Sequence, residues 1–182
     1  GQIKKFNANG EDLFDNQNFQ VKIPFRVTNG DTKKSSISSI AVNNNDVIFA
    51  GDQNNGAVII YNNQGQTLSI FGSKLSNGEQ RVGSFGLING ISIAPNGTLY
   101  VLDKQYNGIH VFQPTQLFAK ILQAISLFND GLYQEAVPLW RDILNANSNF
   151  YLANLGIGKA TYVSKDWTKS MSYMKHASDQ KG

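Results

Sequence analysis

Apolar and polar positions recur along the first two thirds of the chain with a spacing of 51 residues. The two copies align between residues 37 and 112 without a gap. The matched pairs are Ile40 with Ile91, Val42 with Ile93, Ile48 with Leu99, Phe49 with Tyr100, Ala50 with Val101, Asp52 with Asp103, Val58 with Ile109, Ile60 with Val111 and Tyr61 with Phe112. So many matches in one register indicate a structural repeat.

Each copy predicts short β-strands separated by turns rich in Asn and Gly, which tolerate positive φ. The predicted strands are residues 37–42, 47–51, 57–61 and 67–71, then 90–94, 98–102 and 109–112. The runs VIFA, AVIIY and LYVL are apolar at consecutive positions, which is typical of strands buried on both faces. Four antiparallel strands per copy, covered on both faces, predict a β-propeller blade.

The N-terminus carries a partial third copy, in which Ile3 matches Val58 and Leu13 matches Leu68. The sequence thus predicts about two and a half blades, whereas a closed propeller needs at least about four. An incomplete ring leaves apolar sheet faces and a sheet edge uncovered. We therefore expect the chain to form a homo-oligomer through its β part or to refold its edge strands locally.

The last third of the chain carries a second repeat, with a period of about 34 residues. The matched pairs are Ala124 with Gly158, Tyr133 with Trp167, Ala136 with Ser170, Trp140 with Met174 and Ile143 with Ala177. Apolar residues at helical intervals predict helices at about 115–128, 132–145, 149–163 and 167–179. Helix pairs with this period are typical of tetratricopeptide repeats.

Proline and capping residues refine the helix boundaries. Pro114 favours the end of the last strand and the start of the helical segment, with Thr115 as an alternative N-cap just after it. Asp130 and Asp166 are predicted N-caps of the second and fourth helices. Pro138 is expected to kink or loosen the second helix.

The predicted fold class is therefore mixed β plus α. A partial antiparallel propeller occupies residues 1–113, and a two-repeat tetratricopeptide-like α-helical segment occupies residues 114–182.

The strand motif D-Q-N-N-G-A-V-I-I-Y-N-N-Q-G resembles the NHL class of β-propeller repeat. The segments VFQPTQL, EAVPLWRDIL, LGIGKA and D-Q-K-G are similar to Gram-positive bacterial proteins that join an NHL-type propeller, a short tetratricopeptide segment and a Yip-type membrane domain. This resemblance covers nearly the whole chain. It implies a portion of a membrane-tethered protein on the extracellular face of the cell membrane, linked to carbohydrate-import ABC transporters.

Composition narrows the chemistry further. Cysteine is absent, which excludes disulfides, thiolate metal sites and a cysteine nucleophile. Charged residues make up only 16% and the formal net charge is +3, too little to indicate a nucleic-acid binder. No apolar run approaches the roughly 18 residues of a spanning helix, so we expect this part to be soluble.

Asp52 and Asp103 occupy the same position of each blade, before an Asn-rich hairpin. They are predicted to be structural turn carboxylates that accept backbone N–H bonds. The alternative is a metal or substrate site of the propeller-lactonase kind. Because a residue repeated in every blade serves the blade, the structural interpretation is favoured.

The two histidines, His110 and His176, lie in different repeats with no metal-ligand spacing, so no catalytic residue, metal or cofactor is predicted. Basic residues near the N-terminus raise the alternative of RNA binding, but interspersed acidic residues favour a solvated strand edge. These basic residues are Lys4, Lys5, Lys22, Arg26, Lys33 and Lys34.

The third predicted helix carries the weak binding candidates of the chain, for a peptide held in a tetratricopeptide groove. They are Phe150, Tyr151, Asn154 and Lys159. The larger aromatic residues of the segment, Tyr133, Trp140, Trp167 and Tyr173, are expected to pack mostly between helices. The alternative is that the helices only cap the propeller and space it from the membrane.

The function that these patterns favour is a non-catalytic extracellular scaffold or interaction module with a protein or peptide partner. The alternatives are a metal-dependent lactonase or hydrolase and a sensor with a carbohydrate ligand.

Overall fold

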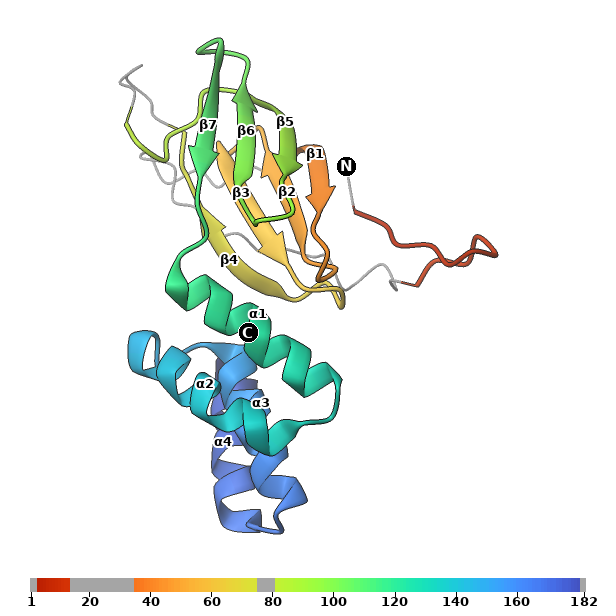
Figure 1. Ribbon diagram of the computed structural model, residues 1–182, viewed down its shortest axis with the longest axis vertical. Coiled ribbons are helices and arrows are strands. Elements are labelled where there is room, and N and C mark those ends of the chain that lie inside the picture. The colour runs from red at the N-terminus through yellow and green to blue at the C-terminus, as the bar shows by residue number, and fades with distance from the viewer. Residues whose placement is uncertain (1–2, 14–34, 75–80, 181–182) are drawn as a thin grey trace. The chain divides into compact units, whose positions relative to one another are not determined.

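The computed structural model describes residues 3–13, 35–74 and 81–180. The chain divides into two compact units, residues 1–113 and residues 114–182 (Figure 1). Among the described residues, every named strand lies in the first unit and every helix in the second. The predicted combination of antiparallel β structure followed by α structure is therefore confirmed.

The described residues of the first unit form two antiparallel sheets with strands in sequence order. Sheet 1 consists of β1 (Ile37–Val42), β2 (Ile48–Asp52), β3 (Ala57–Tyr61) and β4 (Thr67–Phe71). Sheet 2 consists of β5 (Ile88–Ile93), β6 (Leu99–Asp103) and β7 (Gly108–Phe112). The predicted strands agree closely with these, and the largest difference is at the start of β5, predicted at Gly90 and observed at Ile88. In the described part of the chain, the one parallel pairing is an isolated bridge between Ser73 and Ser84.

The two sheets repeat the same backbone irregularities at matched positions of the sequence repeat. The β1–β2 ladder shifts register between Ile37 and Ser39, and the β5–β6 ladder shifts between Ile88 and Gly90. Matched turns also share positive φ angles: Asp46 (57°) with Gly97 (83°), and Gly56 (59°) with Asn107 (50°). Since Gly, Asn and Asp are the residues that best tolerate this conformation, the sequence repeat is also a repeat of backbone geometry.

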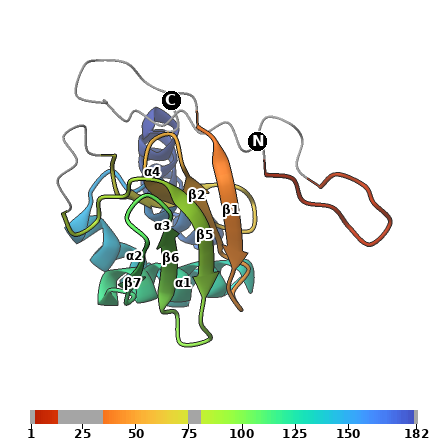
Figure 2. The ribbon, with the colours of Figure 1, turned by 90° about the horizontal axis from the view of Figure 1, so that it is seen from above.

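The sheets pack face to face through β5, which lies against β1 and β2 (Figure 2). A Cβ added to Gly51 would lie 2.6 Å from Cγ2 of Ile88 and 3.1 Å from Cδ1 of Ile91. The hydroxyl of Ser38 donates to the carbonyl oxygen of Ile88 at 2.8 Å. The absence of a side chain at Gly51 thus allows the close approach of β5.

The opposite face of sheet 1 also has a buried cluster, formed by Ile48, Ala50, Ile59 and Tyr61. Ile3 packs against it from the N-terminal segment. Every residue of β2 and β3 is buried, so the prediction of strands covered on both faces is confirmed for these two.

Two predictions for the β unit differ from the structure. Residues 3–13 form an isolated bridge between Phe6 and Asp12 and no strand of a third blade, and the rest of that copy lies outside the described residues. β6 was expected to be buried on both faces, but its residues alternate, with Tyr100 and Leu102 40% and 41% exposed. The reason is that no described element covers the outer face of sheet 2. The described strands form two sheets and no closed propeller.

The second unit consists of four helices, α1 (Gln116–Asn129), α2 (Tyr133–Ala146), α3 (Tyr151–Val163) and α4 (Trp167–Gln180). None of the described helices is long and apolar enough to cross a membrane. The Thr115 hydroxyl accepts the backbone N–H of Phe118 at 3.1 Å, which confirms Thr115 as the N-cap of α1. Asp166 Oδ1 likewise accepts the N–H of Lys169 at 3.2 Å, the bond expected of an N-cap of α4.

One helix-boundary prediction is wrong. Asp130 ends α1 as its C-cap, and Leu132 precedes α2 instead. Gly131, at φ 78°, supplies the left-handed residue that commonly follows a helix, so α2 cannot begin before it. α2 includes Pro138, with buried Ala136 before it and buried Trp140 and Ile143 after it, and a kink at Pro138 stays a prediction.

Helix packing depends on small residues of α3. Trp140 is 1% exposed, and a Cβ added to Gly156 would lie 2.7 Å from both Cδ1 and Cε2 of its indole. The hydroxyl of Ser170 on α4 donates to the carbonyl of Gly158 at 2.9 Å. These contacts bring α2 and α4 close to α3.

Candidate functional site

Asp52 at the end of β2 is fully buried and accepts hydrogen bonds from its surroundings. Its Oδ1 accepts the backbone N–H of Ser36 at 3.0 Å, of Asn54 at 3.1 Å and of Asn55 at 3.3 Å. Its Oδ2 accepts from the side-chain amide of Asn55 at 2.7 Å. The carboxylate therefore joins the segment before β1 to the β2–β3 hairpin.

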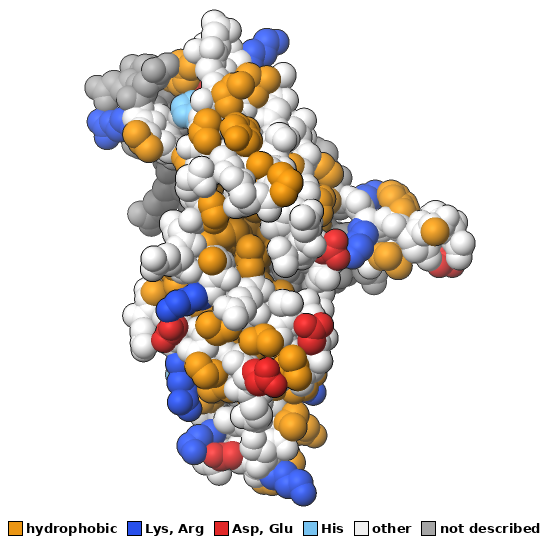
Figure 3. All heavy atoms as spheres, viewed as in Figure 1, with side chains coloured by type: hydrophobic (Ala, Val, Ile, Leu, Met, Phe, Trp, Pro, Cys, Tyr) orange, Lys and Arg blue, Asp and Glu red, His pale blue; other side chains and the backbone are white. Residues whose placement is uncertain are grey.

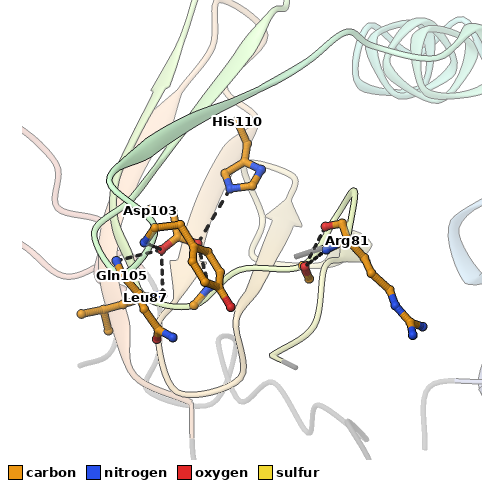
Figure 4. A network of polar contacts seen from close by, with 8 residues as sticks. Arg81, Leu87, Asp103, Gln105 and His110 are labelled. Atoms are coloured by element: carbon orange, nitrogen blue, oxygen red, sulfur yellow. Dashed lines mark hydrogen bonds and ion pairs between the residues drawn. The ribbon is translucent and has the colours of Figure 1, made fainter. Parts of the chain in front are cut away.

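Asp103 accepts a similar set of bonds in sheet 2, and three of its four donors match those of Asp52 (Figure 4). Its Oδ1 accepts N–H groups of Leu87 (3.0 Å), Gln105 (3.0 Å) and Tyr106 (3.3 Å), and its Oδ2 accepts that of Gly86 at 2.7 Å. Burial by itself raises the pKa of Asp103, but the four backbone donors outweigh it and hold the pKa below the ordinary value. Asp103 is thus a charged, fully occupied acceptor.

Three of the four donors of each carboxylate lie at the same sequence offsets. Ser36 and Leu87 each lie 16 residues before their aspartate, and the hairpin donors lie two and three residues after it. A metal ion at either position would compete with these bonds. In the described part of the chain, no group of three or more His, Asp or Glu side chains is placed to hold a metal ion.

His110 lies on β7 beside Asp103 and within an aromatic cluster. Its Nε2 is 3.8 Å from Oδ2 of Asp103, and its ring meets that of Phe85 edge-on at 5.0 Å. Phe85 also lies 6.4 Å from Phe71 of β4 and 5.9 Å from Phe112 of β7. Rings from both sheets therefore pack around Phe85, and His110 is part of that packing. His176, in α4, contacts the carbonyl of Ser172 at 2.9 Å.

The N-terminal basic residues that the structure describes contact other residues of the β unit. Lys4 pairs with Asp12 at 3.3 Å, and Lys5 donates to the carbonyl of Asn63 at 3.4 Å. The remaining four residues of that set, Lys22, Arg26, Lys33 and Lys34, lie outside the described residues.

The structure separates the binding candidates of α3. Asn154 is only 4% exposed, and its amide donates to the carbonyls of Ser148 (3.3 Å) and Phe150 (3.4 Å). Asn154 therefore bonds to the backbone at the start of α3 instead of lining a surface. Phe150, the residue before α3, makes no side-chain cap bond there. Phe150 and Tyr151 are half-buried at the same end.

Lys159, in contrast, lies among aromatic rings. Its Nζ is 5.6 Å from the ring centre of Tyr133 on α2 and 5.6 Å from that of Tyr162 on α3. No described carboxylate forms an ion pair with it. A cation in this position is stabilised by the negative faces of the rings.

Each aromatic neighbour of Lys159 belongs to an edge-to-face pair, and the two pairs occupy matched positions of the helical repeat. Phe128 meets Tyr133 at 5.1 Å and 67°, and Tyr162 meets Trp167 at 5.2 Å and 76°. We call these five residues, Phe128, Tyr133, Lys159, Tyr162 and Trp167, the aromatic row. The pairs show that the helical repeat extends to side-chain geometry.

Trp167 was expected to pack between helices, but it is 55% exposed, as is Tyr162 at 52%. Tyr133, the equivalent of Trp167 in the first helical repeat, is contacted by Lys159 of the following helix, α3. No described helix follows α4 to cover Trp167 in the same way. Sequence reasoning missed Phe128 and Tyr162. Extending the alignment of the helical repeat matches Phe128 with Tyr162 and would have found them.

Comparison with known proteins gives no assignment, since neither a family model nor a curated protein matches the chain.

Proposed function

We propose that this chain is a non-catalytic scaffold that binds a protein partner through the aromatic row of its helical unit. The observation that carries the proposal is the combination of exposed Tyr162 and Trp167 with the cation of Lys159, which forms no ion pair with a described residue. Exposed Met171 (74%), one turn beyond Trp167 on α4, extends the apolar surface. Aromatic residues of this kind are frequent energetic centres of protein interfaces.

The chemistry of the row favours an acidic, partly apolar segment as the partner. A carboxylate near Lys159 would supply the counter-charge that the described residues do not, and apolar side chains would cover Tyr162 and Trp167. Asp52 and Asp103 argue against the hydrolase alternative, because their oxygens accept hydrogen bonds from residues of the β unit. By its resemblance to NHL-repeat proteins, the scaffold would act outside a bacterial membrane, next to a carbohydrate transporter.

The two tryptophans provide a direct test, since Trp167 is 55% exposed and Trp140 only 1%. Acrylamide quenching of the intact chain should therefore report on Trp167. A set of short peptides with one glutamate flanked by leucines should protect Trp167 from quenching, and the same peptides with glutamine should protect it less. Lys159→Met should weaken this binding about fivefold, the size of a cation's contribution at a partly exposed site.

Lys175→Met, which removes an exposed lysine of the same unit, is the matched control and should leave binding unchanged. Equal protection by the glutamate and glutamine peptides would refute the role of Lys159. Protection by sugars and not by any peptide would support the carbohydrate sensor instead. If nothing protects Trp167, the proposed binding surface is wrong.

A further inference from the structure

The outer face of sheet 2 exposes four large apolar side chains on two adjacent strands. Tyr100 pairs with Val111 and Leu102 pairs with Ile109 in the β6–β7 ladder, so all four point to the same side. Their exposed fractions are 40%, 55%, 41% and 64%, respectively. Figure 3 shows hydrophobic side chains gathered over these strands. A face of this kind on a folded sheet indicates an interaction surface.

The internal repeat indicates what covers such a face. The equivalent residues of sheet 1 are Phe49, Gly51, Val58 and Ile60, and all four are buried. Their cover includes β5, whose Ile88 and Ile91 approach Gly51. In sheet 1, therefore, this face is occupied by the first strand of the next sheet in the repeat.

The same chain exposes the complementary surface on β1. Ile40 and Val42 are the residues equivalent to Ile91 and Ile93 of β5, and each is 52% exposed. Ile3 packs against the cluster formed by Ile48 and its neighbours on β2 and β3, but it leaves these two residues of β1 uncovered.

We propose that copies of this chain associate head to tail, with β1 of one copy packed on the outer face of sheet 2 of another. The contact would repeat between copies the packing of β5 on sheet 1 within one copy. Within one copy, Ser38 bonds to Ile88 of β5, and Asn89 is the residue of sheet 2 equivalent to Ser38. The side chain of Asn89 has no hydrogen-bond partner among the described residues and could bond to the second copy. Leu102 replaces Gly51, so the sheets would be spaced more widely at that position. Such a contact joins two different surfaces and generates rings or open chains of copies.

Two single substitutions separate the two surfaces. Leu102→Asp places a charge on the outer face of sheet 2, and Ile40→Asp places one on β1. Both positions are exposed within one copy, so folding should be retained, which far-UV circular dichroism and thermal unfolding would verify. Sedimentation velocity at micromolar concentration should show oligomers for the wild type. Each variant alone should associate about 100-fold more weakly, because the contact would bury an unpaired carboxylate.

An equimolar mixture of the two variants is the decisive sample. Each variant keeps the surface that the other has lost, so the mixture should form a one-to-one dimer and nothing larger. Met171→Asp, in the helical unit, should leave the oligomers unchanged. A monomeric wild type, an Ile40→Asp variant that still associates, or a mixture that stays monomeric would each overturn the proposal. Loss of the oligomers in Met171→Asp would also overturn it and would assign self-association to the helical unit.

Discussion

Replacing Gly156 of α3 by alanine has two opposed effects on the stability of the helical unit. In a helix interior, alanine is favoured over glycine by about 1 kcal/mol, since glycine loses more backbone freedom on folding. The added Cβ, however, would lie within 2.7 Å of two indole carbons of Trp140. Carbon atoms in contact are normally about 3.5–4.0 Å apart, so one of the two groups must move.

The overlap should outweigh the propensity gain. Trp140 is 1% exposed and its ring is rigid, so it cannot turn into solvent. Overpacking of a closed core costs about 1–3 kcal/mol, and a contact with two ring carbons favours the upper end of that range. The net effect of Gly156→Ala should be a loss of about 2 kcal/mol, or about 10 °C in the midpoint of unfolding of a helical unit of this size.

Far-UV circular dichroism during thermal unfolding measures this effect, because the described helices all lie in the second unit. Gly158→Ala is the matched control on the same helix. Its Cβ would meet Cγ of the flexible Met174 side chain at 3.1 Å, so a change of less than about 1 kcal/mol is expected. The Trp140→Phe background should reduce the cost of Gly156→Ala, because the smaller ring leaves space for the methyl group.

Two results would refute this reasoning. The first is a Gly156→Ala variant as stable as the wild type or more stable, which would mean that the helices separate at little cost. The second is an equal loss in the Trp140→Phe background, which would show that the indole is not the obstacle.

Three further changes test the β unit and the junction. Asp103→Asn should destabilise the chain at neutral pH, and because folding lowers the pKa of Asp103, the difference in stability from wild type should shrink as the pH falls below about 4. A difference in urea unfolding that does not change with pH would contradict this. Thr115→Ala should lower the stability by about 1 kcal/mol because it removes the N-cap bond to Phe118, whereas Thr115→Ser should change it little. Thermal unfolding would detect the difference between the two variants. Gly51→Ala should lower the stability by about 1–3 kcal/mol because the added Cβ overlaps with β5, whereas Gly90→Ala, whose added Cβ would lie 3.5 Å from Leu102, should be tolerated. Equal unfolding midpoints of the two variants would contradict this.

The sequence by itself determined the local structure of both units. The register of the first repeat predicted all seven named strands close to their observed bounds, because strand and turn preferences depend on neighbouring residues in the chain. It also matched Asp52 with Asp103, whose bonds run to donors at fixed offsets along the sequence. The cap at Thr115 is likewise decided by its own hydroxyl and the first turn of α1.

Only the tertiary structure decided which apolar residues are covered. Tyr100 and Trp167 match Phe49 and Tyr133 in their repeats, yet both are substantially exposed. Burial depends on whether another element packs over a position, and the pattern of one repeat does not contain that element. For the same reason Asn154, expected on a binding surface, faces inward to hold α3, while Lys159 lies between two rings brought together by the packing of α2 against α3.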